Sequence, residues 1–153
     1  MIHGGPPSTD FDAWEETFYV SANSMCQRGA FVLKPNYHGS LNYGLRFAES
    51  IAAGKYYDLP VEDIERGVDE LIARGLVDPD RLGVLGWSNG AILTLASIVH
   101  SARWKAASSG AGGAEWVGDW AVCEFGEAFD SYYFGKSPLE DPQLYIKMAP
   151  LYE

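Results

Sequence analysis

The most informative segment of the sequence is Leu82-Gly83-Val84-Leu85-Gly86-Trp87-Ser88-Asn89-Gly90. Its first four residues are an apolar run that predicts a buried strand, and a helix is predicted to follow Ser88 at once. Between them lies the pattern G-x-S-x-G, which in a strand–turn–helix setting is typical of a nucleophile elbow. Side chains at Gly86 or Gly90 would collide with the neighbouring strand and helix, which favours glycine at both positions. Such a turn carries the serine oxygen to the carboxyl edge of the sheet, where open α/β folds bind ligands.

Extended and helical segments alternate on both sides of this stretch. We predict short buried strands at residues 30–33, 82–85 and 105–109. Strands that alternate with helices are typical of an α/β domain with a largely parallel sheet. The sequence contains no internal repeat, low-complexity segment or linker, so we expect one domain over residues 1–153.

Three helices are indicated by apolar residues at helical spacing. Those residues are Trp14, Phe18 and Met25 in the first helix, Val61, Ile64, Val68, Leu71 and Ile72 in the second, and Ile92, Leu95, Ala96 and Val99 in the third. Thr9 or Asp10 is expected to cap the first helix, and Gly29 is expected to end it. The second helix is expected to start at Asp58 and to end at Gly75.

A glycine-rich turn lies near the start of the chain, at His3-Gly4-Gly5-Pro6. Acyl transfer builds negative charge on a carbonyl oxygen, and two backbone N–H groups must already point at that oxygen. In elbow-type sites one N–H belongs to the residue after the nucleophile, here Asn89, and the other to a glycine loop after an earlier strand. Beside Ser88, the turn at Gly4 and Gly5 is a candidate for that loop. Without Ser88 the same residues would indicate an ordinary turn.

Composition excludes several classes of protein. The chain has 153 residues, 47% hydrophobic and 21% charged, which suits one globular domain. Its net charge of 11 − 21 = −10 makes it a poor partner for nucleic acid or anionic lipid. No apolar run reaches the length of about 18 residues that a membrane helix needs.

Cys26 and Cys123 make neither a disulfide framework nor a zinc site. With no metal motif or nucleotide loop, we predict no metal and no cofactor. The first residues do not read as a signal peptide, and the compartment stays open.

Three blocks of sequence carry a resemblance to a known family. They are His3-Gly4-Gly5-Pro6, then residues 34–40 with Tyr43-Gly44, then residues 77–90. In order and approximate spacing they resemble the catalytic domain of the prolyl oligopeptidase family of serine peptidases. Residues 133–138 also resemble that family, so the likeness covers essentially the whole chain.

The resemblance implies a partial α/β-hydrolase fold, with a mostly parallel sheet flanked by helices. It also implies an enzyme that hydrolyses peptide bonds in short peptides. On this interpretation Ser88 is the nucleophile that forms an acyl-enzyme, and Asn89 and Gly5 supply the N–H groups of the oxyanion hole. Trp116 falls where some members place an aromatic wall of the substrate pocket, although ordinary core is the alternative for it. His38 departs from the family pattern, which usually has arginine there, and we assign it no catalytic role.

The base that would activate Ser88 is not evident in the sequence. A serine hydroxyl needs a histidine within hydrogen-bond reach and a carboxylate that orients the histidine. In α/β-hydrolases both follow the serine in the chain. His100 is the one histidine after Ser88, and twelve residues of helix would hold it about 18 Å away. His3 is expected on the oxyanion side of the site, where a base for Ser88 is not expected.

The resemblance accounts for this gap, because the family's acid and histidine lie on loops beyond the point that matches Glu153. We therefore expect a partial catalytic domain, cut at both ends, that lacks the first and last strands and the family's propeller domain. Its open sheet edges would favour pairing with the rest of the catalytic domain or with a second chain. The isolated chain is expected to be inactive.

Two other functions stay open at this stage. Many esterases share the elbow and the glycine loop, although the blocks at residues 34–40 and 77–90 favour a peptidase. A non-catalytic interaction module on an old hydrolase scaffold would explain the missing histidine. A strained turn costs about 1–3 kcal/mol and such a module has no need of it, which weakly opposes that alternative.

Overall fold

A small parallel sheet lies at the centre of the fold. The structure is a computed structural model, and it describes residues 1–15 and 21–153. Strand β1 (Gly83–Trp87) pairs in parallel with β2 (Ala106–Gly110). The connecting helix α4 (Asn89–His100) packs against both strands. On the other side of β1, Ile2 forms a parallel bridge to Gly86 and donates its N–H to the Leu85 carbonyl at 2.8 Å. The predicted parallel sheet flanked by helices is thus confirmed.

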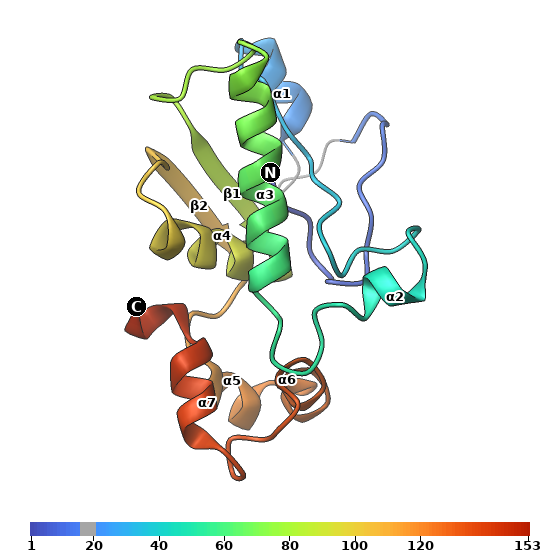
Figure 1. The fold of residues 1–153 in the computed structure, drawn as a ribbon, viewed down its shortest axis with the longest axis vertical. Helices are drawn as coiled ribbons and strands as arrows, with labels where there is room; N and C mark the ends of the chain where they lie inside the picture. The colour runs from blue at the N-terminus through green and yellow to red at the C-terminus, as the bar shows by residue number, and fades with distance from the viewer. Residues whose placement is uncertain (16–20) are drawn as a thin grey trace.

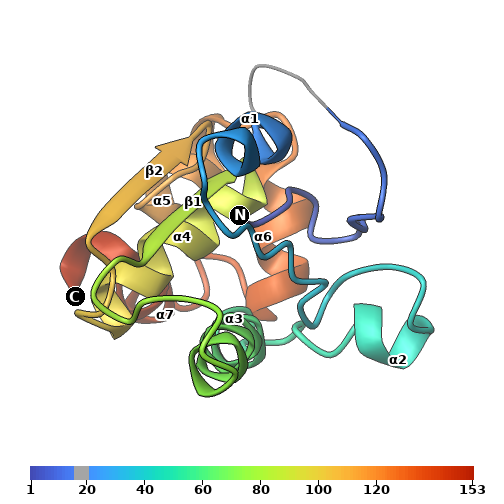
Figure 2. The same cartoon turned by 90° about the horizontal axis from the view of Figure 1, so that it is seen from above.

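The other helices surround this sheet. They are α1 (Ala22–Gln27), α2 (Leu45–Ala48), α3 (Asp58–Ala73), α5 (Trp116–Val122), α6 (Gly126–Phe134), α7 (Pro142–Met148) and the 3-10 helix η1 (Pro150–Tyr152). Both strands run toward the end of the sheet where α5, α6 and α7 gather (Figure 1). Viewed from above, α4 lies between the sheet and α7, and α2 projects to one side (Figure 2). The carboxyl edge of the sheet therefore faces the three C-terminal helices.

The helices and strands nearest to residues 82–90 match their predictions. Helix α3 begins at Asp58 and ends at Ala73, with Val61, Ile64 and Val68 buried. Gly75, two residues beyond its end, has a positive φ of 69°. Strands β1 and β2 lie within two residues of the predicted ranges. These elements form as predicted because strong local periodicity coincides with a partner to pack against.

The strand predicted at residues 30–33 is wrong, and the described sheet has two strands where we predicted three. The segment is irregular, and Phe31 is 55% exposed. Its contact with the sheet side of the molecule is a hydrogen bond from the Met1 amino group to the Leu33 carbonyl, at 2.8 Å. A strand needs a ladder of backbone partners, and this single hydrogen bond does not form one.

The helix predicted after Thr9 and Asp10 does not start there. The Thr9 hydroxyl donates to the Leu41 carbonyl at 2.8 Å, and the Asp10 carboxylate pairs with Lys34 at 3.2 Å. Both side chains thus make tertiary contacts in place of the predicted cap. Helix α1 begins at Ala22, Trp14 is 72% exposed, and Phe18 lies outside the described residues. Gly29 does follow the helix with a left-handed φ of 86°.

Two groups of buried side chains form the core. The aromatic cluster lies among α5, α6, α7 and the start of α3, and it comprises Ile51, Tyr56, Ile92, Trp116, Tyr133, Phe134, Tyr145 and Ala149. The sheet cluster lies between β1, α3 and α4, and it comprises Ile2, Tyr37, Ile64, Val84 and Leu93. Helix α4 contributes to both, because Ile92 and Leu93 point into different clusters.

Candidate active site

Ser88 occupies the turn between β1 and α4, and its backbone is strained. Its φ of 55° and ψ of −123° lie in a region that a residue with a side chain rarely adopts. The side chain is exposed, whereas the next residue, Asn89, is buried. The strand, the tight turn and the helix that follows therefore present the serine hydroxyl at the carboxyl edge of the sheet.

The flanking glycines allow three segments to pack against one another at this turn. A Cβ atom at Gly86 would overlap the carbonyl group of Gly90, and one at Gly90 would overlap the carbonyl oxygen of Ile2. Both φ values are outside the left-handed region, so close approach and not backbone freedom requires glycine here. The structure thus gives the reason for the two glycines that the sequence singled out.

The His3-Gly4-Gly5 turn lies directly against Ser88. A Cβ atom at Gly4 would stand 3.3 Å from the Ser88 Cβ and 3.8 Å from its Oγ. Gly5 has a positive φ of 124°, which favours glycine. In the described part of the chain, neither the Gly5 N–H nor the Asn89 N–H donates a hydrogen bond. The Asn89 N–H is at the first position of α4, where no earlier turn offers an acceptor and the helix dipole favours negative charge.

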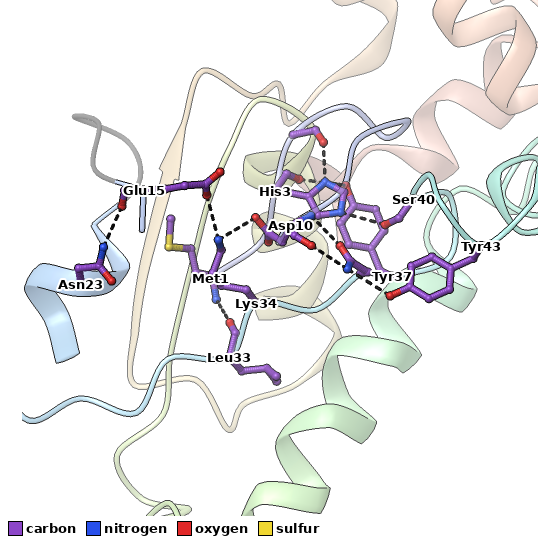
Figure 3. Close-up of polar contacts among 12 residues, drawn as sticks. Met1, His3, Asp10, Glu15, Asn23, Leu33, Lys34, Tyr37, Ser40 and Tyr43 are labelled. Carbon is purple, nitrogen blue, oxygen red and sulfur yellow. Dashed lines mark hydrogen bonds and ion pairs between the residues drawn. The ribbon is translucent and has the colours of Figure 1, made fainter. Parts of the chain in front are cut away.

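His3 is held by its own polar contacts, among them one to Ser40 (Figure 3). Its Nδ1 lies 2.7 Å from the Gly4 carbonyl, which accepts only, so Nδ1 carries the proton. Nε2 therefore accepts from the Ser40 hydroxyl at 2.9 Å. Burial lowers the pKa of His3, and its ring stacks on that of Tyr37 at 4.4 Å between centroids. Neutral and bonded at both nitrogens, His3 supports the glycine turn and offers no free nitrogen to Ser88.

A buried polar chain runs behind the turn, and sequence reasoning missed it. The Tyr56 hydroxyl donates to the Asn89 side-chain oxygen, and the Asn89 amide donates to the Tyr37 hydroxyl at 2.9 Å. The Tyr37 hydroxyl donates in turn to the His3 carbonyl at 2.9 Å. The one signal available in the sequence was that Tyr37 belongs to the block at residues 34–40.

His38, where the sequence departs from the family pattern, forms a pair with Asp63 of α3. Its Nδ1 lies 2.6 Å from the Asp63 carboxylate, which also accepts the His38 backbone N–H at 2.7 Å. The ring packs on Phe47, with centroids 4.3 Å apart. His38 thus anchors the loop of residues 34–44 to α3. This role was not predicted, because it depends on Asp63, which lies 25 residues further along the chain.

Trp116 and His100 lie in different surroundings from Ser88. Trp116 is 1% exposed within the aromatic cluster, and its Nε1–H is shared between the Tyr57 hydroxyl and the Met148 carbonyl, at 2.9 and 3.1 Å. Its assignment to a substrate pocket stays a prediction. His100 is exposed at the end of α4 opposite to Ser88. In the described residues, none of the three histidines hydrogen-bonds to Ser88.

Asp130 is a buried carboxylate beside the aromatic cluster. Both of its oxygens lack a hydrogen-bond partner among the described residues, and the side chain is 0% exposed. Burial, with a smaller contribution from the charge of Asp119, raises the pKa of Asp130 to about 7. The sequence gave no hint of this, because one acidic residue on a short helix ordinarily faces solvent. Such a group carries its proton below neutral pH and loses it above.

The model of the prolyl oligopeptidase family matches residues 16–153. Among residues 1–15 and 21–153, the structure contains no helix with the length and hydropathy of a membrane span.

Individual relatives match almost the whole chain. The "Uncharacterized peptidase YuxL" of Bacillus subtilis (strain 168) is 29% identical over 98% of this chain and 22% of its own length. The acylamino-acid-releasing enzyme of Arabidopsis thaliana is 32% identical over 99% of this chain and 20% of its own length. The solved structure of the Pyrococcus horikoshii acylaminoacyl peptidase matches with a TM-score of 0.86 and 28% identity, over 99% of this chain and 24% of that protein. The chain therefore spans about a fifth to a quarter of each relative.

Proposed function

This chain belongs to the prolyl oligopeptidase family of serine peptidases, and from that premise we propose that it carries the nucleophile and the oxyanion hole of a peptidase. Ser88 is the nucleophile, and the N–H groups of Gly5 and Asn89 bind the oxyanion. We further propose that residues 1–153 are part of a catalytic domain, and that the peptides it acts on are short.

One observation carries the proposal: an exposed serine in a strained turn with the glycine turn packed on it. Ser88 has a φ of 55°, and a Cβ atom at Gly4 would stand 3.8 Å from its Oγ. A strained backbone persists only where the surrounding structure enforces it, and it is concentrated at functional sites. Two free N–H donors on the segments that meet at Ser88 suit the charge that develops during acyl transfer.

The reaction follows from this arrangement. The Ser88 oxygen attacks the peptide carbonyl, a base takes its proton, and the carbonyl oxygen becomes negative between the two N–H donors. The intermediate collapses to an acyl-enzyme and the amine leaves with a proton, after which water releases the acid. His3 is bonded at both nitrogens and His38 is paired with Asp63, so we assign the base and its carboxylate to groups outside residues 1–153.

The relatives suggest which substrate to test first. Two of them are named for releasing or hydrolysing acylated amino acids. We therefore propose that peptides with an acylated N-terminal residue are substrates of the whole protein.

Steady-state hydrolysis by the whole protein tests the proposal. We expect cleavage of an N-acetylated aminoacyl amide and of an acetylated dipeptide, with kcat lowered by about a thousandfold or more in Ser88→Ala. Cleavage of a short-chain ester without cleavage of either amide would favour the esterase alternative. Equal activity of Ser88→Ala and the wild type would contradict the proposal.

One observation favours a second candidate, a non-catalytic module. In the described residues, no ring nitrogen of the three histidines accepts a hydrogen bond from the Ser88 hydroxyl. If the whole protein hydrolyses no amide or ester and Ser88→Ala keeps every measurable property, this module is the better description.

A further inference from the structure

The Tyr37 hydroxyl stands where three parts of the chain meet. It donates its single proton to the His3 carbonyl at 2.9 Å and accepts from the Asn89 side-chain amide at 2.9 Å. The residue is 0% exposed, and its ring stacks on that of His3 with 20° between the planes. Figure 3 shows the Tyr37 ring beside that of His3.

The two partners of this hydroxyl belong to the two halves of the proposed oxyanion hole. Asn89 carries one N–H donor on the first turn of α4, and His3 is two residues before Gly5, which carries the other. The same segments also meet through the bridge of Ile2 to Gly86 in β1 and through the close packing of Gly4 on Ser88. The Tyr37 hydroxyl adds to these contacts a hydrogen-bonded junction that joins the glycine turn to the first residue of α4.

The far side of the Asn89 side chain is also fixed. Its oxygen accepts from the Tyr56 hydroxyl, so the amide is held between two tyrosines with its orientation determined. Burial raises the pKa of Tyr37 and of Tyr56, so both keep their protons at any working pH. These hydrogen bonds therefore transfer no proton, and their effect is to fix the positions of the groups that they join.

We infer that Tyr37 is a positioning residue, which holds the N–H groups of Asn89 and Gly5 at the separation that an oxyanion needs. The inference rests on the proposed function, since it assigns Tyr37 a task in that reaction. An oxyanion hole binds the transition state and not the ground state, so a change in its spacing acts on kcat and leaves KM nearly unchanged. Removing a donor outright costs about 100- to 1,000-fold in kcat. A donor that remains but is displaced should cost less, on the order of 10- to 100-fold.

Tyr37→Phe in the whole protein is the direct test, because phenylalanine keeps the stacked, buried ring and removes only the hydroxyl. Tyr145→Phe is the matched control. Tyr145 is also 0% exposed, and its hydroxyl also donates to a backbone carbonyl, that of Lys136 at 3.0 Å, away from the turn. With an N-acetylated aminoacyl amide we expect Tyr37→Phe to lower kcat by about 10- to 100-fold with KM within about twofold. The control should stay within about twofold in both constants.

A second variant separates position from general stability. Asn89→Ala removes the other side of the same junction and keeps the peptide N–H. Because the two side chains act through one contact, the double variant should lose no more kcat than the worse single variant. If circular dichroism shows that Tyr37→Phe is unfolded, Asn89→Ala alone must show the same fall in kcat at constant KM.

The possible failures are distinguishable. A wild-type protein that hydrolyses the amide, with Tyr37→Phe unchanged in kcat or altered equally with Tyr145→Phe, overturns this inference and leaves the proposed function standing. The inference is also overturned if the fold-loss in kcat of the double variant equals the product of the losses in the two single variants. A wild-type protein with no hydrolysis overturns the proposed function, and this inference with it.

Discussion

The Ser88 turn of residues 86–90 and the aromatic cluster around Trp116 are neighbours that are stabilised in different ways. The turn holds an exposed serine at a φ of 55°, fixed by glycines and buried hydrogen bonds. The cluster is built from edge-to-face ring pairs, such as Trp116 and Phe134 with centroids 4.9 Å apart. Tyr56 belongs to both, since its ring is in the cluster and its hydroxyl bonds to Asn89. The strained backbone and the close-packed rings thus lie in separate regions, and Tyr56 contacts both.

We expect the largest loss of stability from a substitution within the Ser88 turn. Gly90→Ala places a Cβ atom on the Ile2 carbonyl oxygen, where backbone and not a flexible side chain must move. We expect a loss of more than about 4 kcal/mol in the free energy of unfolding, or no folded protein. Gly83→Ala in β1 is the control, because its Cβ would stand 3.6 Å from the nearest atom. Urea denaturation followed by circular dichroism checks both, and equal stabilities would contradict the packing described for the turn.

The next effect tests the cluster. Trp116→Ala removes a side chain that is 1% exposed and should lower the free energy of unfolding by about 3–5 kcal/mol. Trp14→Ala is its control, since Trp14 is 72% exposed and should change stability by less than about 0.5 kcal/mol. A small effect of Trp116→Ala in the same denaturation experiment would mean that the cluster is not core.

Only part of this contrast could be predicted from the sequence. The glycine turn, Ser88 and the elements α3, β1, α4 and β2 carry strong local patterns, and those elements formed as predicted. The strand at residues 30–33 did not form, because a strand depends on backbone partners that a local pattern does not contain. The polar partners of Asn89 could not be predicted, because Tyr37 and Tyr56 lie 52 and 33 residues before it.

Asp130 offers a pH-dependent test at the border of the cluster. Its pKa of about 7 lies above the unfolded value of 3.8, so the native state binds more protons between these pH values. Stability should therefore fall as pH rises from about 4 to about 7 and stay low above that. Asp130→Asn should raise the free energy of unfolding by about 1–3 kcal/mol at pH 8 and by much less at pH 4. Melting temperatures of both proteins across pH 4–8 check this, and a gain that is the same at every pH would contradict it.

The smallest effect concerns the strain at Ser88. Glycine adopts a positive φ freely, so Ser88→Gly should raise the free energy of unfolding by about 1 kcal/mol. Ser88→Ala meets the same backbone strain and should give no such gain. Calorimetric melting of the two variants side by side measures the difference. Equal melting temperatures would mean that the turn stores no strain.

Fluorophosphonate labelling, located by peptide mass mapping, directly tests the assignment of Ser88 as the nucleophile, because this probe forms a covalent adduct with activated serines. It should be run on the whole protein and on residues 1–153, with Ser88→Ala as the control and circular dichroism to establish folding. We predict that the probe attaches to Ser88 in the whole protein, that Ser88→Ala abolishes the adduct, and that folded residues 1–153 stay unlabelled. An adduct on another residue of the whole protein, or none, would contradict the assignment of Ser88. An adduct on Ser88 in residues 1–153 would contradict the assignment of the base to groups outside them.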